Sequence, residues 1–359
     1  MSLRQKRKIF YWSPCLTQVG TVISTKNSAI AMANYKKNDF EVYIINACGE
    51  WNDHKSDFNL NGVHVINLNF NYFWLLPKEG YFFSRLSYII IFLLSFFPLL
   101  IKIRTEKPDY FIMHLITSLP IFLLSIFKFN TKFILRISGF PKLNIIRKFL
   151  WKIVSKKIYK ITCPTKELKS QIIEKKIFDI NRIFYLQDAI LNLKNFTKSS
   201  EFIYDIDNLE DKIILAVGRL THQKNFAFLI KEFKKFLLTH KNYSLIILGD
   251  GEQKKKLKTI IKDYKIEHKV YLQGRVSNVY EYMRKANVFV LSSLWEELGF
   301  VLVEAAFNNL FIISSDCPNG PKEFIDQNKC GILFKNNENN SLLSALKQFD
   351  NSDSLIKKK

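Results

Sequence analysis

Residues 292–323 read SSLWEELGFVLVEAAFNNLFIISSDCPNGPKE, and the order of elements in this stretch decides the fold. An apolar run of β-type residues, Val288–Leu291, leads into it, and a second such run lies inside it at Phe311–Ser314. Between the two runs the pattern predicts a helix from about Phe300 to Asn308. The stretch is therefore predicted to be a strand–loop–helix–strand unit.

Two glutamates flank the start of this predicted helix. Glu296 lies in the loop before it and Glu304 lies in its second turn, with Gly299 and Phe300 between them. A helix N-terminus has free N–H groups and the positive end of the helix dipole, which attract anions. Carboxylates around such an end indicate hydroxyl acceptors on either side of a phosphate, which is the shape of a nucleotide-sugar. The alternative is a pair of solvated carboxylates at a helix end.

Strands and helices alternate along the rest of the chain. Strands are predicted at Lys8–Trp12, Glu41–Asn46, Val63–Leu68, Tyr110–His114, Lys132–Ile137, Ile158–Cys163, Ile213–Val217, Ser244–Leu248, Val270–Gln273 and Ile332–Phe334. Helices are predicted at Thr25–Lys36, Arg85–Ile103, Leu119–Phe127, Leu143–Lys156 and Lys166–Lys175, and in each gap of the second half. This alternation predicts an α/β protein with two doubly wound parallel sheets, which bind ligands at the carboxyl ends of their strands.

The predicted domains are residues 1–190 and 212–345, joined by a polar linker at 191–211 and followed by a basic tail at 346–359. With 359 residues, 48% of them hydrophobic, the chain can bury two cores. Its five cysteines show no C-x-x-C spacing, so they indicate buried thiols in a reducing compartment rather than disulfides or a zinc site. The net charge of +22 indicates an anionic partner or a general bias toward lysine and asparagine.

Two uncharged runs, Leu86–Ile101 and Phe111–Phe127, could form a membrane hairpin. Each is shorter than the roughly 20 residues that span a bilayer, and Pro98 and Pro120 interrupt them. A helix that is buried or touches lipid, then a strand and a second buried helix, is the preferred interpretation.

Residues 142–160, KLNIIRKFLWKIVSKKIYK, are predicted to form a basic amphipathic helix. Lysines recur at every fourth position, and apolar side chains line another face: Lys148, Lys152, Lys156 and Lys160 against Phe149, Leu150, Ile153 and Val154. Such a helix suits an anionic membrane surface, which predicts peripheral, electrostatic membrane association. A helix packed on its sheet with its lysines in water remains the alternative.

Four motifs in order, each at a predicted strand end, resemble the donor site of glycosyltransferase family 4, whose members are retaining enzymes of the GT-B fold. They are Val217–Asn225 (VGRLTHQKN), Leu248–Gly251 (LGDG), Glu296-x7-Glu304 after Leu294-Trp295, and Ser315–Glu323 (SDCPNGPKE). The resemblance is strong over residues 211 to about 345 and weaker in the first half.

The resemblance implies roles for the residues of the second domain. Arg219 and Lys224 would bind the donor diphosphate and stabilise the charge that grows on it in the transition state. Glu296 would accept a hydrogen bond from a hydroxyl of the transferred sugar, and Glu304 would accept hydrogen bonds from the ribose hydroxyls. Leu298, Gly299 and Phe300 would offer backbone N–H groups to phosphate and sugar, and Gly218, Gly274 and Arg275 complete the predicted donor set. The chain departs from the common motif at Glu297, where glycine is usual.

In the first domain, Gly20 lies in a loop, QVGT, that resembles the family's glycine-containing phosphate loop, although the usual second glycine is missing. His114 ends a predicted strand, and the resemblance implies that it touches the donor sugar or the acceptor. A histidine satisfied in the core is the alternative.

The resemblance implies retaining transfer of a hexose or N-acetylhexosamine from a UDP- or GDP-linked donor, without a metal, in cell-envelope glycan synthesis. The expected partners are the nucleotide-sugar, a lipid-linked glycan acceptor and the anionic inner face of the cytoplasmic membrane. The chain ends soon after Phe349, where family members continue, so truncation and a catalytically inactive, membrane-associated scaffold remain open. Nucleic-acid binding rests on charge alone, since no recognised binding motif accompanies it.

Overall fold

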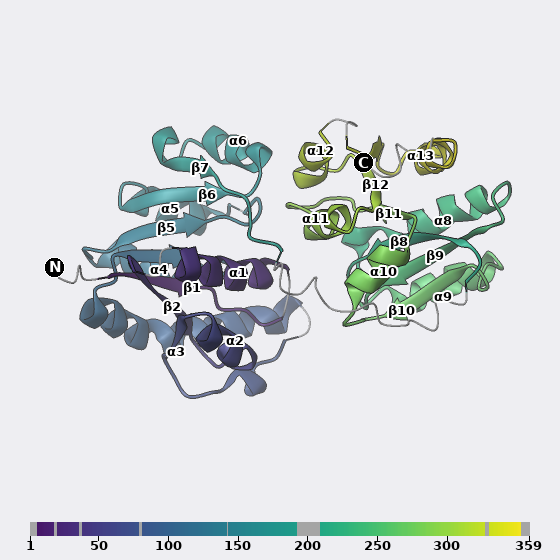
Figure 1. Ribbon diagram of the computed structural model, residues 1–359. Coiled ribbons are helices and arrows are strands. Elements are labelled where there is room, and N and C mark those ends of the chain that lie inside the picture. Colours follow the sequence, from purple (N-terminus) through teal and green to yellow (C-terminus); the bar gives the residue numbers. More distant parts are fainter. Residues whose placement is uncertain are drawn as a thin grey trace. The chain divides into compact units, whose positions relative to one another are not determined.

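The computed structural model describes residues 6–17, 20–35, 38–78, 81–141, 143–191, 209–326 and 330–352. The chain forms two compact units, Met1–Ile190 and Leu191–Lys359, and each is described here by itself (Figure 1). Most of the expected linker, residues 192–208, lies outside the described part.

The first unit is built on a seven-stranded parallel sheet with the order β3-β2-β1-β4-β5-β6-β7. Its strands are β1 Arg7–Trp12, β2 Phe40–Asn46, β3 Val63–Asn67, β4 Tyr110–Met113, β5 Lys132–Arg136, β6 Ile158–Cys163 and β7 Ile183–Tyr185. The strand order reverses between β1 and β4, so the loops after these two strands meet at the switch point where ligands of such sheets bind.

Helices cover both faces of the first sheet because successive side chains of its strands point to opposite sides. Phe10 and Trp12 of β1 pack in one buried cluster with helices α3 to α6, while Ile9 and Tyr11 pack in another with α1 and α2. The helices are α1 Gly20–Tyr35, α2 Lys55–Leu60, α3 Tyr81–Glu106, α4 Ser118–Ile126, α5 Ile145–Val154 and α6 Lys166–Glu174, with short 3-10 turns η1 Asn52–His54, η2 Phe73–Leu75 and η3 Ile180–Arg182.

The second unit repeats this plan on a six-stranded parallel sheet with the order β10-β9-β8-β11-β12-β13. The strands are β8 Lys212–Val217, β9 Tyr243–Leu248, β10 Val270–Gly274, β11 Val288–Leu291, β12 Phe311–Ser315 and β13 Ile332–Phe334. One face packs against α8 Phe226–Leu237, α9 Lys254–Asp263 and α13 Ser341–Asp350, and the other against α10 Val279–Lys285 and α11 Phe300–Phe307. The short α12 Gly320–Phe324 follows β12, and η5 His222–Lys224 follows β8.

The structure confirms the predicted fold class and moves several boundaries. Strand β7 and helix α2 escaped the sequence analysis because each is short. Helix α1 begins at Gly20, five residues before the expected start, so Gly20 belongs to a helical turn rather than a free loop; Gln18 and Val19 lie outside the described residues. Helix α13 runs to Asp350, so residues 346–350 are part of the folded second unit and not of a tail.

The helix that contains the first apolar run is longer than the sequence analysis predicted. Helix α3 continues through Pro98 and spans 26 residues, and Phe82–Glu106 is long and apolar enough to cross a membrane by length and composition. A membrane hairpin is nevertheless wrong, because the second run contains β4, which pairs with β1 and β5. One side of α3 packs in the core, while the other exposes large apolar residues, with Leu93 64% and Phe97 67% exposed.

The four-lysine stripe is also wrong. Helix α5 ends at Val154, so Lys148 and Lys152 lie on it while Lys156 lies in the following turn and Lys160 in β6. The helix is amphipathic in another sense. Trp151 and Val154 are buried, whereas its first turns expose apolar side chains, with Ile145 89% exposed.

Candidate functional site

The switch point of the second sheet brings two of the four sequence motifs together. Strands β8 and β11 are neighbours although about 70 residues separate them in the chain. The loop after β8 carries Gly218 to Lys224, and the loop after β11 carries Ser292 to Gly299. Both loops leave the carboxyl edge of the sheet, where doubly wound sheets bind nucleotides.

At this edge Lys224 and Glu296 form a buried ion pair. The ammonium group of Lys224 contacts Oε1 of Glu296, and the two side chains are only 14% and 9% exposed. The hydroxyl of Ser293 donates to the same oxygen at 2.6 Å. Both bonds end on Oε1, and no described residue donates to Oε2. The carboxylate is therefore held in place while one of its oxygens remains available as an acceptor.

Hydrogen bonds between the two loops fix this geometry. The backbone N–H of Leu294 donates to the carbonyl of Gln223 at 2.8 Å, and the Gln223 side chain donates to the carbonyl of Trp295 at 2.8 Å. The hydroxyl of Ser292 donates to the carbonyl of Lys224, also at 2.8 Å. Because the loops are tied at three points, the ion pair is part of a rigid edge.

Glycines allow the backbone to approach closely at this edge. A Cβ on Gly218 would lie 3.0 Å from Cε of Lys224, so glycine at that position leaves the lysine its path. A Cβ on Gly249 would lie 1.9 Å from the carbonyl oxygen of Gly218, so only glycine lets the turn after β9 pack this closely against the turn after β8. Gly249 also donates to the carbonyl of Gly274 at 2.7 Å. Gly274, the last residue of β10, is thus joined by a hydrogen bond to the turn after β9.

Helix α11 begins at this edge as the sequence predicts. Gly299 precedes it with φ +70° and ψ 61°, a left-handed conformation that glycine adopts without strain. Leu298 is buried, and a Cβ on Gly320 would lie 2.4 Å from its carbonyl oxygen. Gly320 also donates to the carbonyl of Glu297 at 2.7 Å. The SDCPNGPKE motif therefore packs against the loop after β11 and holds it in place. Phe300 is the first residue of the helix.

Glu304 lies in α11 and receives a hydrogen bond from the hydroxyl of Tyr280 in α10, at 3.3 Å. Burial raises the pKa of Glu304 to about 7, although the hydrogen bond from the tyrosine hydroxyl lowers this pKa in part. Burial also raises the pKa of Tyr280, and the charge of Glu304 and the hydrogen bond to it raise that pKa further. The carboxyl group is thus poised to change its charge near neutral pH, and a donor of hydroxyl hydrogen bonds would favour its ionised form.

Two predicted cations of the donor set lie on the surface. Arg219 and Arg275 are exposed, and their side chains form no hydrogen bond or ion pair with any residue that the structure describes. Arg219 follows β8 by two residues and Arg275 follows β10 directly, so both stand at the carboxyl edge.

In the first unit, His114 follows β4 at the switch point but is only 1% exposed. Its Nδ1 contacts the hydroxyl of Thr25 in α1, and its Nε2 contacts the hydroxyl of Ser138 after β5. Burial lowers the pKa of His114 to about 3, with the positive charge of Arg136 adding to the effect, so the ring is neutral. The structure shows the satisfied histidine that was the alternative, and contact with a ligand would require it to exchange one of these bonds.

The sequence analysis missed Ser293 and Tyr280, the partners of the two glutamates. Ser293 could have been found, because it lies three residues before Glu296 in the deciding stretch. Tyr280 gave no signal, since it reaches Glu304 from another helix. Within the described ranges, no group of three or more His, Cys, Asp or Glu side chains could hold a metal ion.

The second unit, which carries this site, is similar to known glycosyltransferases. Residues 202–358 match the family model "Glycosyl transferases group 1". An uncharacterized glycosyltransferase of Methanocaldococcus jannaschii is 35% identical over 254 residues, which are 62% of this chain and 59% of that protein. A 4-α-N-acetylgalactosaminyltransferase of Campylobacter jejuni, named for a glycan linked to diphospho-undecaprenol, is 32% identical over 48% of this chain and 50% of its own length. The chain thus spans about half the length of these first curated relatives.

A second Campylobacter jejuni enzyme, an α-1,4-N-acetyl-D-galactosaminyltransferase named for an undecaprenol diphosphate-linked glycan, is 28% identical over 95% of this chain and 91% of its own. Among solved structures, a glycosyltransferase from Rickettsia africae superposes with a TM-score of 0.76 at 17% identity, covering 98% of this chain and 91% of that one. An Anabaena protein in complex with UDP and glucose superposes with a TM-score of 0.73 at 12% identity, with the same coverage. The likeness shows the GT-B fold.

Proposed function

We propose that the chain is a glycosyltransferase of group 1, whose family model matches residues 202–358, and that it transfers a hexose or N-acetylhexosamine from a UDP- or GDP-linked donor to a lipid-linked or polysaccharide acceptor of the cell envelope. The observation that carries this proposal is the buried pair of Lys224 and Glu296 at the switch point of the second sheet. Beside the start of α11, the ammonium group of Lys224 offers a cation for a phosphate, and the Oε2 atom of Glu296 offers an acceptor for a sugar hydroxyl.

Each charged group has a task in this reaction. The diphosphate would attract the ammonium of Lys224 and the exposed guanidinium of Arg219, and both would stabilise the charge that grows as the glycosidic bond breaks. Oε2 of Glu296 would accept a hydrogen bond from a hydroxyl of the transferred sugar. Glu304 would accept the ribose hydroxyls, and the edge formed by Gly274 and Arg275 would lie beside the base. Because cations meet the diphosphate, we expect no metal requirement.

The resemblance of the motifs to those of retaining glycosyltransferases supports a retaining outcome. Glu296 and Glu304 are both committed to hydroxyl groups, so neither is free to act as a covalent nucleophile. We propose a front-face displacement in which the leaving phosphate itself helps to remove the proton of the acceptor.

The proposed acceptor and location rest on the relatives and on the first unit. Two relatives from Campylobacter jejuni are named for acceptors linked to undecaprenol through a diphosphate. In this chain the exposed apolar sides of α3 and α5 suit the interfacial region of a bilayer. We therefore propose that the protein lies on the inner face of the cytoplasmic membrane, held by apolar insertion as well as by charge.

A donor-hydrolysis screen tests the proposed function. The purified protein is incubated with UDP- and GDP-linked hexoses and N-acetylhexosamines, with and without EDTA, and release of the nucleoside diphosphate is measured. We expect slow hydrolysis of one donor that EDTA does not abolish and that Lys224→Ala reduces about a hundredfold. Absence of turnover and of binding for every donor would instead support an inactive scaffold.

A further inference from the structure

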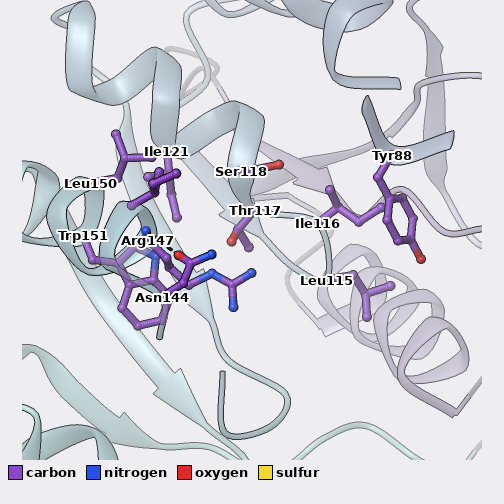
Figure 2. A pocket seen from close by; sticks show the side chains of 11 residues that line it. Tyr88, Leu115, Ile116, Thr117, Ser118, Ile121, Asn144, Arg147, Leu150 and Trp151 are labelled. Carbon is purple, nitrogen blue, oxygen red and sulfur yellow. Dashed lines mark hydrogen bonds between the residues drawn. The ribbon is translucent and has the colours of Figure 1, made fainter. Parts of the chain in front are cut away.

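The first unit contains a pocket of about 500 Å³ that the donor site does not use. It lies between α3, the loop from β4 into α4, and α5 (Figure 2). Its volume is in the range of small-molecule sites, about 300–1,000 Å³. The loop on its wall begins at Leu115, directly after His114, so the pocket stands at the switch point of the first sheet.

The lining has two chemically distinct parts. One part is apolar and consists of Leu115, Ile116, Ile121, Leu150 and Trp151. The other is polar, with Thr117, Ser118, Asn144 and Arg147. Figure 2 shows the Arg147 guanidinium directed from α5 toward the side of the pocket that Thr117 forms. A ligand for this pocket must combine an apolar body with a group that hydrogen bonds.

The charge of the pocket selects an anion. Arg147 is exposed at its rim, and a smaller neighbouring cavity of about 240 Å³ is also lined by Arg147 and by Arg136. The charge of Arg85 on α3 reaches Arg147, since after burial it is the second cause that lowers the pKa of that guanidinium. Two guanidinium groups on the two helices that flank the pocket would repel a cation and form strong hydrogen bonds with phosphate.

The surroundings select a lipid rather than a free anion. Ile146 lines the pocket and belongs to the exposed apolar start of α5, and Tyr88 lines it from α3. Beyond Tyr88 the exposed side of α3 continues with Ile89, Leu93 and Phe97. An inorganic phosphate would gain nothing from these apolar surfaces, whereas a lipid chain would bury against them.

We propose that this pocket binds the phosphate headgroup of a lipid-linked acceptor, with Arg147 contacting the phosphate and the exposed sides of α3 and α5 contacting the lipid chain. This proposal rests on the proposed transferase function and specifies the acceptor end of it. In the proposal the phosphate lies at the carboxyl edge of the first sheet, so the sugar that the lipid carries lies near His114.

Equilibrium binding of a polyisoprenyl diphosphate in neutral detergent micelles tests the pocket without any need for turnover. We expect Arg147→Gln to weaken binding about tenfold or more, because a charge-assisted contact is lost. The matched control is Lys128→Gln, which removes one positive charge just beyond the far end of α4, about 14 Å from the end of that helix that lines the pocket. This control should bind the lipid within about twofold of the unchanged protein.

A second variant, Ile146→Gln, lies on an exposed helix turn and so does not threaten folding. It should weaken binding of the phosphorylated lipid about fivefold and leave binding of inorganic diphosphate unchanged. Equal affinity of Arg147→Gln and Lys128→Gln for the lipid would overturn the proposal. It would also be overturned if uncharged polyisoprenol bound as tightly as the diphosphate, or if inorganic diphosphate alone displaced the lipid at equal concentration.

The donor-hydrolysis screen separates this proposal from the proposed function. Hydrolysis without selective lipid binding rejects the pocket alone. Lipid binding without any donor turnover rejects the transferase function alone.

Discussion

Breaking the buried ion pair of the second unit should cost more stability than exchanging both of its members. In Lys224→Met the carboxylate of Glu296 stays buried with only the hydroxyl of Ser293 as donor. Removal of one partner from a buried pair typically costs about 3–5 kcal/mol, because the remaining charge is uncompensated. For a unit of this size, about 3 kcal/mol lowers the unfolding temperature by roughly 6–12 °C.

The double variant Lys224→Met/Glu296→Gln removes both charges. It should recover most of that loss, because an amide beside a thioether carries no net charge and the Ser293 hydroxyl can still donate to the amide oxygen. Glu296→Gln alone should lie between the two, since the ammonium keeps an oxygen to contact. The coupling energy of the cycle is therefore expected to be about 2 kcal/mol or more.

Thermal unfolding followed by calorimetry measures the cycle on the full chain. Lys335→Met serves as the matched control, because Lys335 pairs with Glu338 at 3.5 Å on the surface of the same unit. Its unfolding temperature should not change measurably, since exposed pairs contribute little. If the two single changes at the buried pair simply add in the double variant, the charges do not depend on each other and the reasoning fails.

Further predictions concern rate, pH, stereochemistry and membrane binding. Arg219→Ala should lower turnover about a hundredfold with little change in donor affinity, which single-turnover kinetics would show. Because burial raises the pKa of Glu304 to about 7, binding of an intact nucleotide-sugar should tighten from pH 6 to pH 8, and calorimetry should detect proton release at pH 6. Over the same range the free energy of unfolding should fall as pH rises, because the folded carboxyl binds its proton more tightly than the unfolded one, and both slopes should vanish in Glu304→Gln. Product NMR should show the anomeric configuration of the donor, and an inverted centre would overturn the front-face mechanism. Changing Leu93 and Phe97 together to serine should release the protein from liposomes in high salt, whereas the unchanged protein should stay bound; release of both alike would reduce the attachment to charge alone.

The sequence was sufficient for the fold class and for the elements at the carboxyl edge of the second sheet, because both follow from short-range patterns. The run Val288–Leu291, the glycine at 299 and the apolar helix after it each carry a local signal, and the structure confirms all three. The left-handed backbone at position 299 favours glycine, so the glycine itself is the sequence signal for that conformation. The pairing of Lys224 with Glu296 was not anticipated, although both residues were assigned to the site. It depends on β8 and β11 being neighbours, which is a property of the whole sheet.

The failures in the first unit have a different cause, which is that apolar periodicity does not say what covers a helix. The lysine spacing at 148–160 suggested one helical stripe, which conflicted with the strand predicted at Ile158–Cys163. The strand prediction is confirmed, since β6 begins at Ile158 and pairs with β5, and α5 already ends at Val154. Likewise, the uncharged run Leu86–Ile101 stops at charged residues such as Arg85, but the helix α3 continues past them. Once tertiary pairing sets these limits, the apolar residues left on the outside of α3 and α5 need another partner. In our proposal the charge of Arg147 beside them favours an anionic lipid as that partner, and a basic stripe alone could not have suggested it.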